Sequence, residues 1–283
     1  MTRRCTQREF LLRPSPVTNQ IVRYVLAVAL QRTRVQLHQC IVMSDHVHLV
    51  VTDPEARLPE FQHYFDGNVA RAMNAVLGRS QAFWDDSGYN AVVLATPEAV
   101  VESSAYLLAN PVAAGLVERG SEWPGVWTDP ASIGGAPEVI ERPNVFFRRN
   151  GPTPERVELR LTPPPGFTAE EYRSRVLTAV AAHEQNARAA VKAKGKTFLG
   201  VRRVLAQKTT MRATRPEKRG RLRPTIATRD RRARLEELSR LSQFLDRYRR
   251  ARARFTVGIR DVVFPAGTYW LRVSCGVACE ATG

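Results

Sequence analysis

The sequence predicts an α+β protein with a ferredoxin-like domain in its first half and a basic, mainly helical region in its second half. Strand-type and helix-type patterns follow one another in the order β-α-β-β-α-β over the first 95 to 110 residues, and one further helix follows. Nearly all the excess positive charge comes after residue 150. We therefore expect an α+β domain over residues 1–130, a Pro- and Gly-rich connection over 131–167, and a basic helical region over 168–283.

The first three strands and the first helix follow from local patterns. Residues 7–12 form a short apolar run, and Thr18 is a candidate N-cap for a helix over 19–34 with apolar residues at helical spacing. Residues 35–43 and 46–52 predict two strands, which Ser44-Asp45 would join as a hairpin.

The remaining elements of the first half complete the β-α-β-β-α-β order and add the third helix. An apolar stripe predicts a helix over 58–78, ending at a glycine, and residues 89–94 predict a fourth strand. Thr96 and Pro97 predict the start of a third helix that runs to about residue 109. A sheet of this order carries two helices on one face, so the third helix can cover the open face.

The charge distribution indicates a polyanionic partner for the second half. Residues 1–150 hold 14 Lys and Arg against 15 Asp and Glu, whereas residues 151–283 hold 29 against 12. Basic segments bind nucleic acid by releasing condensed counterions. We favour nucleic acid over a membrane surface, because the sequence shows no signal peptide, lipidation signal or long apolar run.

The cysteines predict a reduced cytosolic protein. Cys5 and Cys40 stand alone, and Cys275 and Cys279 lack a second Cys or His pair at zinc spacing. A structural zinc at the C-terminus is the alternative reading of that pair.

Two of the five histidines stand two residues apart in the third predicted strand. Alternation along a strand turns His46 and His48 to one face and Val47, Leu49 and Val51 to the other. Two adjacent imidazoles have the separation that one divalent cation needs from two ligands. A His-x-His pair on a strand is more often a solvated polar face, so the interpretation needs a second feature.

The third helix supplies the second feature. Tyr106 and Asn110 are four residues apart and project from one side of a helix. The amide oxygen of Asn110 can join two imidazoles on Mg²⁺ or Mn²⁺, which leaves positions open for phosphate oxygens. A deprotonated phenol next to such an ion can attack phosphorus. Without the histidines, Tyr106 would be read as a core residue.

These residues resemble a known family. His46-Val47-His48 resembles the HUH motif, in which U is a bulky apolar residue, and the segment 106–117 resembles the Tyr-x-x-x-Asn-Pro-Val-x-Ala-Gly-Leu-Val segment of single-tyrosine transposases. The chain is most similar to the REP-associated tyrosine transposases, over about residues 1–130. Ser44-Asp45 replaces a frequent Pro-Asn of the family, and Ala113 replaces a frequent Arg.

The resemblance implies a function and a set of roles. His46, His48 and Asn110 would hold Mg²⁺ or Mn²⁺, and Tyr106 would form a 5′-phosphotyrosine intermediate on single-stranded, hairpin-forming DNA. It also implies a bacterial cytoplasmic, nucleoid-associated protein. Whether one chain or two complete the site, and so whether the protein is a monomer or a homodimer, stays open.

Other residues have ordinary explanations. His38 and His63 are expected to be surface or hydrogen-bonded residues, and His183 belongs to a polar helix. Phe83 and Trp84 can stack on unpaired bases, but packing in the core is the favoured use.

The second half is read from its helices and arginines. Residues 130–165 predict an irregular arm on the first domain, and helices are expected over 168–194, 197–206 and 229–255, with a final hairpin or strand pair over 262–273. The segment 212–234 reads as a basic arm too charged to bury. The residues expected to contact nucleic acid are Arg202, Arg203, Arg219, Arg221, Arg223, Arg231 and Arg232.

Three functions follow from these observations. The favoured one is a metal-dependent single-strand DNA endonuclease and strand transferase that uses Tyr106. A binding protein for structured DNA or RNA without catalysis is the second, and an RNA nuclease the third. The third is disfavoured because such nucleases use a 2′-hydroxyl or an activated water.

Overall fold

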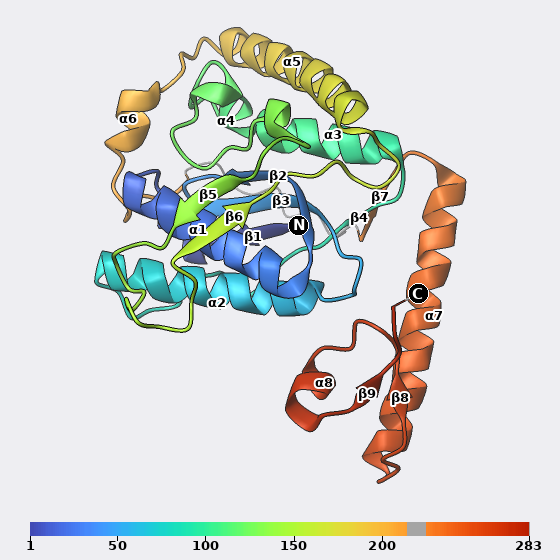
Figure 1. Ribbon diagram of the computed structural model, residues 1–283. Coiled ribbons are helices and arrows are strands. Elements are labelled where there is room, and N and C mark those ends of the chain that lie inside the picture. The colour runs from blue at the N-terminus through green and yellow to red at the C-terminus, as the bar shows by residue number, and fades with distance from the viewer. Residues whose placement is uncertain (214–224, 283) are drawn as a thin grey trace.

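A computed structural model describes residues 1–213 and 225–282 and shows a mixed α/β protein with small sheets. Strands β1 (Thr2–Arg4), β2 (Gln36–Val42) and β3 (His46–Thr52) form an antiparallel sheet in the order β1-β3-β2. Helices α1 (Pro16–Thr33) and α2 (Leu58–Leu77) lie on one face of it, and α3 (Pro97–Leu108) on the other, as Figure 1 shows. A longer helix, α5 (Ala169–Ala193), packs on α3.

The sheet separates two hydrophobic cores, as strand alternation requires. Val47 and Leu49 pack with α1 and α2 in the first core, whereas Val50 packs with residues of α3 and α5 in the second. The predicted hairpin and the placement of the third helix are therefore confirmed. The register slips once, between Leu37 and Gln39, at a bulge that leaves His38 buried and hydrogen-bonded to Thr52.

The ends of these helices follow from their capping residues. Ser15 rather than Thr18 caps α1, because its Oγ accepts from the backbone N–H of Thr18. Gly78 ends α2 in the left-handed conformation, and Thr96 caps α3 through the N–H of Ala99, both as predicted. A four-residue helix, α4 (Asn110–Ala113), follows α3 after one residue.

Two strand predictions in the first half are wrong. The first strand is Thr2–Arg4 and not residues 7–12, where the chain forms a 3₁₀ turn at Thr6–Arg8 and a second turn in which the N–H of Arg13 donates to the carbonyl of Phe10. From the segment 89–94, only Asn90 reaches the central sheet, through a bridge to Thr2. The remaining strand, β4 (Val93–Leu94), pairs in parallel with β7 (Ile226–Ala227).

Residues after 131 complete both cores. Strands β5 (Glu138–Glu141) and β6 (Arg156–Leu159) form a hairpin against α1, so the predicted arm lies on the first domain but is not irregular. Val157 and Leu159 belong to the first core, and Tyr172 and Val176 of α5 belong to the second. Packing is therefore continuous across residue 130.

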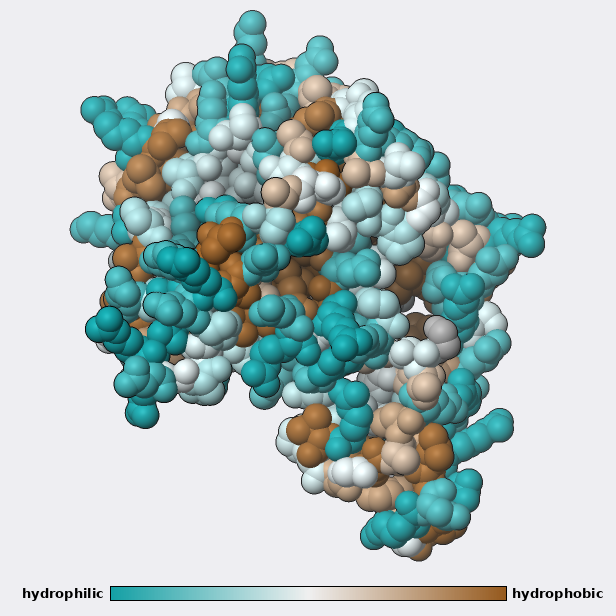
Figure 2. All heavy atoms as spheres, viewed as in Figure 1, coloured by the Kyte–Doolittle hydropathy of each residue, from teal (hydrophilic) through white to brown (hydrophobic). Residues whose placement is uncertain are grey.

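The C-terminal region forms a lobe around α7 (Arg231–Thr256). The predicted strand pair over 262–273 is wrong: β8 (Val263–Phe264) pairs in parallel with β9 (Ala278–Cys279), and α8 (Trp270–Cys275) lies between them. A short helix, α6 (Val201–Leu205), was predicted and lies across the molecule from α7. Hydrophobic residues gather on the surface of the lobe in the lower part of Figure 2.

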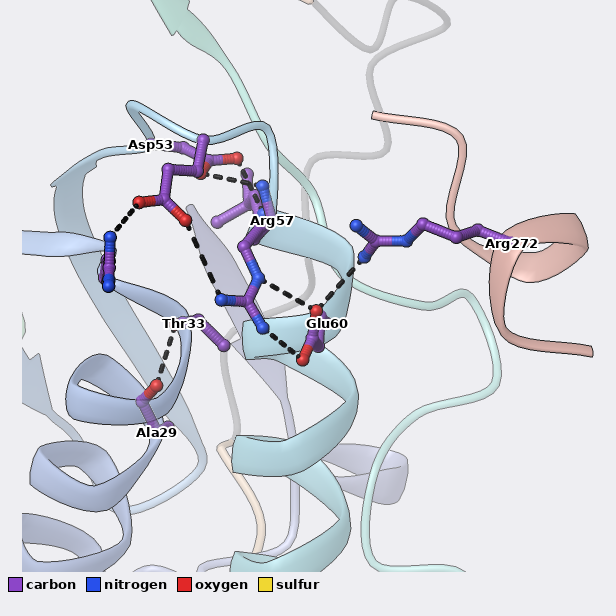
Figure 3. A network of polar contacts seen from close by, with 9 residues as sticks. Ala29, Thr33, Asp53, Arg57, Glu60 and Arg272 are labelled. Carbon is purple, nitrogen blue, oxygen red and sulfur yellow. Dashed lines mark hydrogen bonds and ion pairs between the residues drawn. The ribbon is translucent and has the colours of Figure 1, made fainter. Parts of the chain in front are cut away.

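A chain of charged side chains joins the lobe to α2 (Figure 3). The carboxylate of Glu60 accepts from the guanidinium of Arg57 at 2.7 and 3.0 Å and from that of Arg272 at 3.1 Å. Asp53 accepts from the backbone N–H groups of Arg57 and Leu58 at the start of α2. Surface pairs of this kind stabilise by about 0–1 kcal/mol each, so they orient the lobe more than they stabilise it.

No helix within residues 1–213 and 225–282 is both long and apolar enough to cross a bilayer.

Gly120 is expected to be the position near α3 that tolerates a side chain least. An added Cβ would lie 2.5 Å from the carbonyl oxygen of Leu108, at the end of α3. We predict that Gly120→Ala lowers the free energy of unfolding by about 1–3 kcal/mol in urea titrations. Gly67→Ala, in the middle of α2, is the control and should be neutral or stabilising, since Arg71 is its only close neighbour in the described chain. Equal effects of the two changes would contradict the close approach at Gly120.

Candidate metal and tyrosine site

His46 and His48 lie side by side on the face of the sheet that α3 covers. Their ring centroids are 4.7 Å apart and the ring planes are nearly perpendicular. His48 is directly opposite Ile41 of β2 in the register, and Ile41 belongs to the core that α3 completes. The structure thus brings the two imidazoles together, as alternation in β3 predicted.

Each ring is held through its Nδ1 atom. Nδ1 of His46 lies 2.6 Å from Oδ1 of Asp45, and Nδ1 of His48 lies 2.7 Å from Oγ1 of Thr2. When both Nδ1 atoms donate, both Nε2 lone pairs are available, and no hydrogen bond in the described part of the chain uses either Nε2. Histidines that bind metals are typically held in this way through the second nitrogen.

Sequence reasoning missed the role of these two partners. Asp45 stands next to His46, so the signal was present, and its carboxylate also pairs with Arg8 at 3.4 Å. Thr2 was missed because the first strand was placed at residues 7–12. Burial alone would raise the pKa of Asp45, but the hydrogen bond from His46 and the charges of His46 and Arg8 outweigh it and lower that pKa.

The electrostatics of the pair favour a neutral His48. Burial lowers the pKa of His48 well below its usual range, and the neighbouring His46 ring and the N-terminal ammonium act in the same direction. A neutral imidazole is the form that binds a metal ion.

Tyr106 and Asn110 lie at the junction of α3 and α4. The side chain of Tyr106 is 59% exposed, so it is not a core residue, and Asn110 is half-buried at the first position of α4. Ala109 keeps helical backbone angles between the two helices, and its N–H bonds to the carbonyl of Ala105. The histidine rings contact each other, Asp45 and Thr2, and no hydrogen bond or ring contact within the described residues joins either ring to Tyr106.

The predicted ligands are two imidazoles and one amide. No group of three or more His, Cys, Asp or Glu side chains within residues 1–213 and 225–282 is arranged to hold a metal ion. Two imidazoles and one amide fall outside such groups, and they leave coordination positions for substrate oxygens.

The residues predicted to bind nucleic acid form two separate groups. Arg202 and Arg203 are exposed on α6, whereas Arg231 and Arg232 are exposed at the start of α7, on the other side of the molecule (Figure 1). Arg219, Arg221 and Arg223 lie outside the described residues.

The other candidates of the sequence are structural. Phe83 and Trp84 are buried in the first core, so core packing is confirmed for both. His38 is buried, His183 pairs with Glu102, and Cys5, Cys40, Cys275 and Cys279 are free thiols.

Comparisons of the chain with protein family models, curated proteins and solved structures give no match.

Neutral His48 predicts a pH dependence of stability. Because its pKa is lower in the folded than in the unfolded chain, the unfolded chain binds the additional proton below about pH 6.5, and folding loses free energy as the pH falls through that value. We predict that the urea midpoint falls between pH 7 and pH 5, and that His48→Asn reduces this fall. An unchanged slope in His48→Asn would contradict a lowered pKa of His48 in the folded chain.

Proposed function

We propose that this chain is a metal-dependent endonuclease and strand transferase for single-stranded, hairpin-forming DNA. The observation that carries the proposal is the pair of imidazoles 4.7 Å apart, each held at Nδ1, on the face that the tyrosine-bearing helix covers. In the described chain, neither Nε2 atom makes a hydrogen bond. Packing alone would not require both of these nitrogens to be left without partners.

His46, His48 and Asn110 are the residues that would hold Mg²⁺ or Mn²⁺. The ion, when bound, would polarise the scissile phosphate and offset the charge that develops on it. Asp45 and Thr2 would fix the orientation of the two rings, and neutral His48 would need no deprotonation before binding.

Tyr106 would be the nucleophile. Its exposed phenol can approach a DNA strand from solvent, which a buried tyrosine cannot do. The phenol would lose its proton, and its Oη would form a bond to phosphorus as the bond to the 3′ oxygen breaks. The products would be a 5′-phosphotyrosine and a free 3′-hydroxyl, so the energy of the phosphodiester would be kept for strand transfer.

The sheet supports a ferredoxin-like arrangement for the catalytic part. In such an arrangement the fourth strand lies beside the first, and the bridge between Asn90 and Thr2 is at that edge. Only one residue of the expected strand pairs there, because the chain then turns to meet β7.

The arginines at the start of α7 support a nucleic-acid partner. Positive charge is unfavourable at a helix N-terminus, where the macrodipole favours acidic residues. Arg231 and Arg232 lie there, exposed, although Asp230 caps the helix. Arg232 pairs with Glu236 one turn on, at 3.0 Å, which offsets part of that cost. Contact with phosphates would account for the rest of their position.

A covalent adduct with Tyr106 tests the proposal. We predict that the protein with Mn²⁺ forms an adduct with a labelled single-stranded hairpin, seen as a shifted band on a denaturing gel, and that Tyr106→Phe abolishes it. Tyr248→Phe, a change in the C-terminal lobe, should leave the yield unchanged. A Tyr106→Phe protein that forms the adduct as efficiently as the native protein would refute the assignment.

The adduct experiment also tests the alternative of a binding protein without catalysis. Hairpin binding that resists EDTA and His46→Asn, with no adduct on any substrate, would favour that alternative.

A salt titration tests the arginines of α7. The double change Arg231→Ala and Arg232→Ala should weaken binding of single-stranded DNA and reduce the slope of log affinity against log salt by about 1–1.5. The pair Arg156→Ala and Arg160→Ala, exposed around β6, is the control. Equal slopes for all three proteins would contradict a phosphate contact at α7.

A further inference from the structure

Arg4 lies on the same face of the sheet as the imidazole pair. In the antiparallel pairing of β1 with β3, Thr2 is directly opposite His48 and Arg4 is directly opposite His46. Residues in such positions share a face and have Cβ atoms about 4.5–5.5 Å apart. The hydrogen bond between Thr2 and the ring of His48 fixes this face for Thr2, and alternation gives the same face to Arg4.

The neighbouring arginine is turned to the other side of the sheet. Nε of Arg3 pairs with Oδ2 of Asp66 on α2 at 3.0 Å, and its guanidinium lies 5.6 Å from the ring centroid of Trp84. The charge of Arg3 is therefore paired with a carboxylate on the α2 side. Arg4 is exposed and belongs to the face that α3 covers.

Protection of a sheet edge does not account for Arg4. Charged residues on an edge strand often prevent pairing with another chain. At β1 that edge is already occupied, because the N–H groups of Thr2 and Asn90 each donate to the carbonyl of the other residue, at 2.8 and 2.9 Å. The N–H of Asp85 also donates to the carbonyl of Arg4 at 2.9 Å. The edge is thus covered by backbone hydrogen bonds.

The charges at this end of the imidazole pair favour an anion. Asp45 holds His46 and would repel a phosphate, but its carboxylate is 3.4 Å from the guanidinium of Arg8, which offsets that charge. Burial is the main cause of the lowered pKa of His48, and the charge of Arg4 is among those that add to it. The charge of Arg4 is therefore felt at the rings and attracts a phosphate to them.

A guanidinium beside the rings suits a DNA backbone. Arginine contacts phosphate oxygens with two parallel hydrogen bonds and stays charged at every accessible pH. A strand whose scissile phosphate lies at the two imidazoles has a phosphate within reach of Arg4, because Arg4 is opposite His46. The sequence could not show this neighbour, since the first strand was predicted at residues 7–12.

We propose that Arg4 binds a backbone phosphate of the strand that lies at the imidazole pair and so positions the scissile bond. That the strand is DNA, and that it is cut, rests on the proposed function, whereas the phosphate contact of Arg4 does not.

Binding of single-stranded DNA in EDTA tests the contact. Fluorescence anisotropy would measure the affinity for a labelled oligo(dT) over a range of salt concentrations. Arg4→Gln should weaken binding by about 10-fold, the lower end of the range for one hydrogen bond to a charged group, because the contact is exposed to solvent. It should also reduce the slope of log affinity against log salt by about 0.7. Arg4→Lys keeps the charge and should keep the slope of the native protein.

Arg71→Gln is the matched control. It removes the same charge from an exposed arginine of α2, on the other side of the sheet, and should leave affinity and slope unchanged. Thermal midpoints check the folding of all three variants. Native affinity and slope in Arg4→Gln would overturn the proposal. So would an equal loss in Arg71→Gln, or an Arg4→Lys protein that loses as much as Arg4→Gln, which would indicate a structural role.

The adduct assay separates this proposal from the proposed function. With Mn²⁺ and the labelled hairpin below its Kd, Arg4→Gln should form the Tyr106 adduct about 10-fold more slowly. If the native protein forms no adduct but Arg4→Gln loses affinity and slope, the phosphate contact stands without the catalytic function. If Arg4→Gln forms the adduct at the native rate and keeps the native slope, the assignment of Arg4 alone is wrong.

Discussion

Alternation along β3 is the constraint on which the site depends. Val47 and Leu49 are fixed in the core below α1 and α2, and Val50 is fixed in the core below α3. A slip of one residue would expose one set and bury the other on the wrong side, so the register is strongly specified. The same register places His46 and His48 next to each other on the sheet face that α3 covers. Both residues pair with β1, and His48 also pairs with Ile41 of β2. The placement of the two imidazoles side by side is thus a consequence of core packing.

The second requirement is that α3, which covers that face, is itself held in place, and part of that support comes from the half of the chain that was expected only to bind nucleic acid. The hydroxyls of Ser104 and Tyr172 lie 2.7 Å apart between α3 and α5, and Glu184 accepts from the N–H of Gly120 near the end of α3. Trp127 donates to the carbonyl of Leu108 at the same end. These contacts fix the helix that carries Tyr106, so the second half of the chain contributes to the position of Tyr106.

The sequence predicted those features that follow from local rules. The hairpin, both helices of the first core, the cap of α3 and the face of the histidines all depend on periodicity and capping, and the structure agrees. The pairing of β4 with β7 and of β8 with β9 could not be predicted, because two-residue parallel strands depend on contacts between segments 15 to more than 130 residues apart. The sequence placed the first strand wrongly because Phe10, Leu11 and Leu12 form an apolar run. In the structure this run lies at a turn, and Leu11 and Leu12 are buried there. Of the candidate site, the adjacent imidazoles follow from alternation, whereas Thr2 could be found only once β1 was placed.

The central claim is that the imidazole pair and the Tyr106 phenol approach one metal ion, within one chain or between two. The most direct measurement is ¹⁹F NMR of protein labelled with 3-fluorotyrosine, with the Tyr106 signal assigned by its loss in Tyr106→Phe and Mn²⁺ added below stoichiometry. Paramagnetic broadening falls steeply with distance. The account predicts that the Tyr106 signal broadens before those of the other six tyrosines, and that His46→Asn combined with His48→Asn prevents this. A Tyr106 signal that stays sharp while the histidines bind Mn²⁺ would contradict the account.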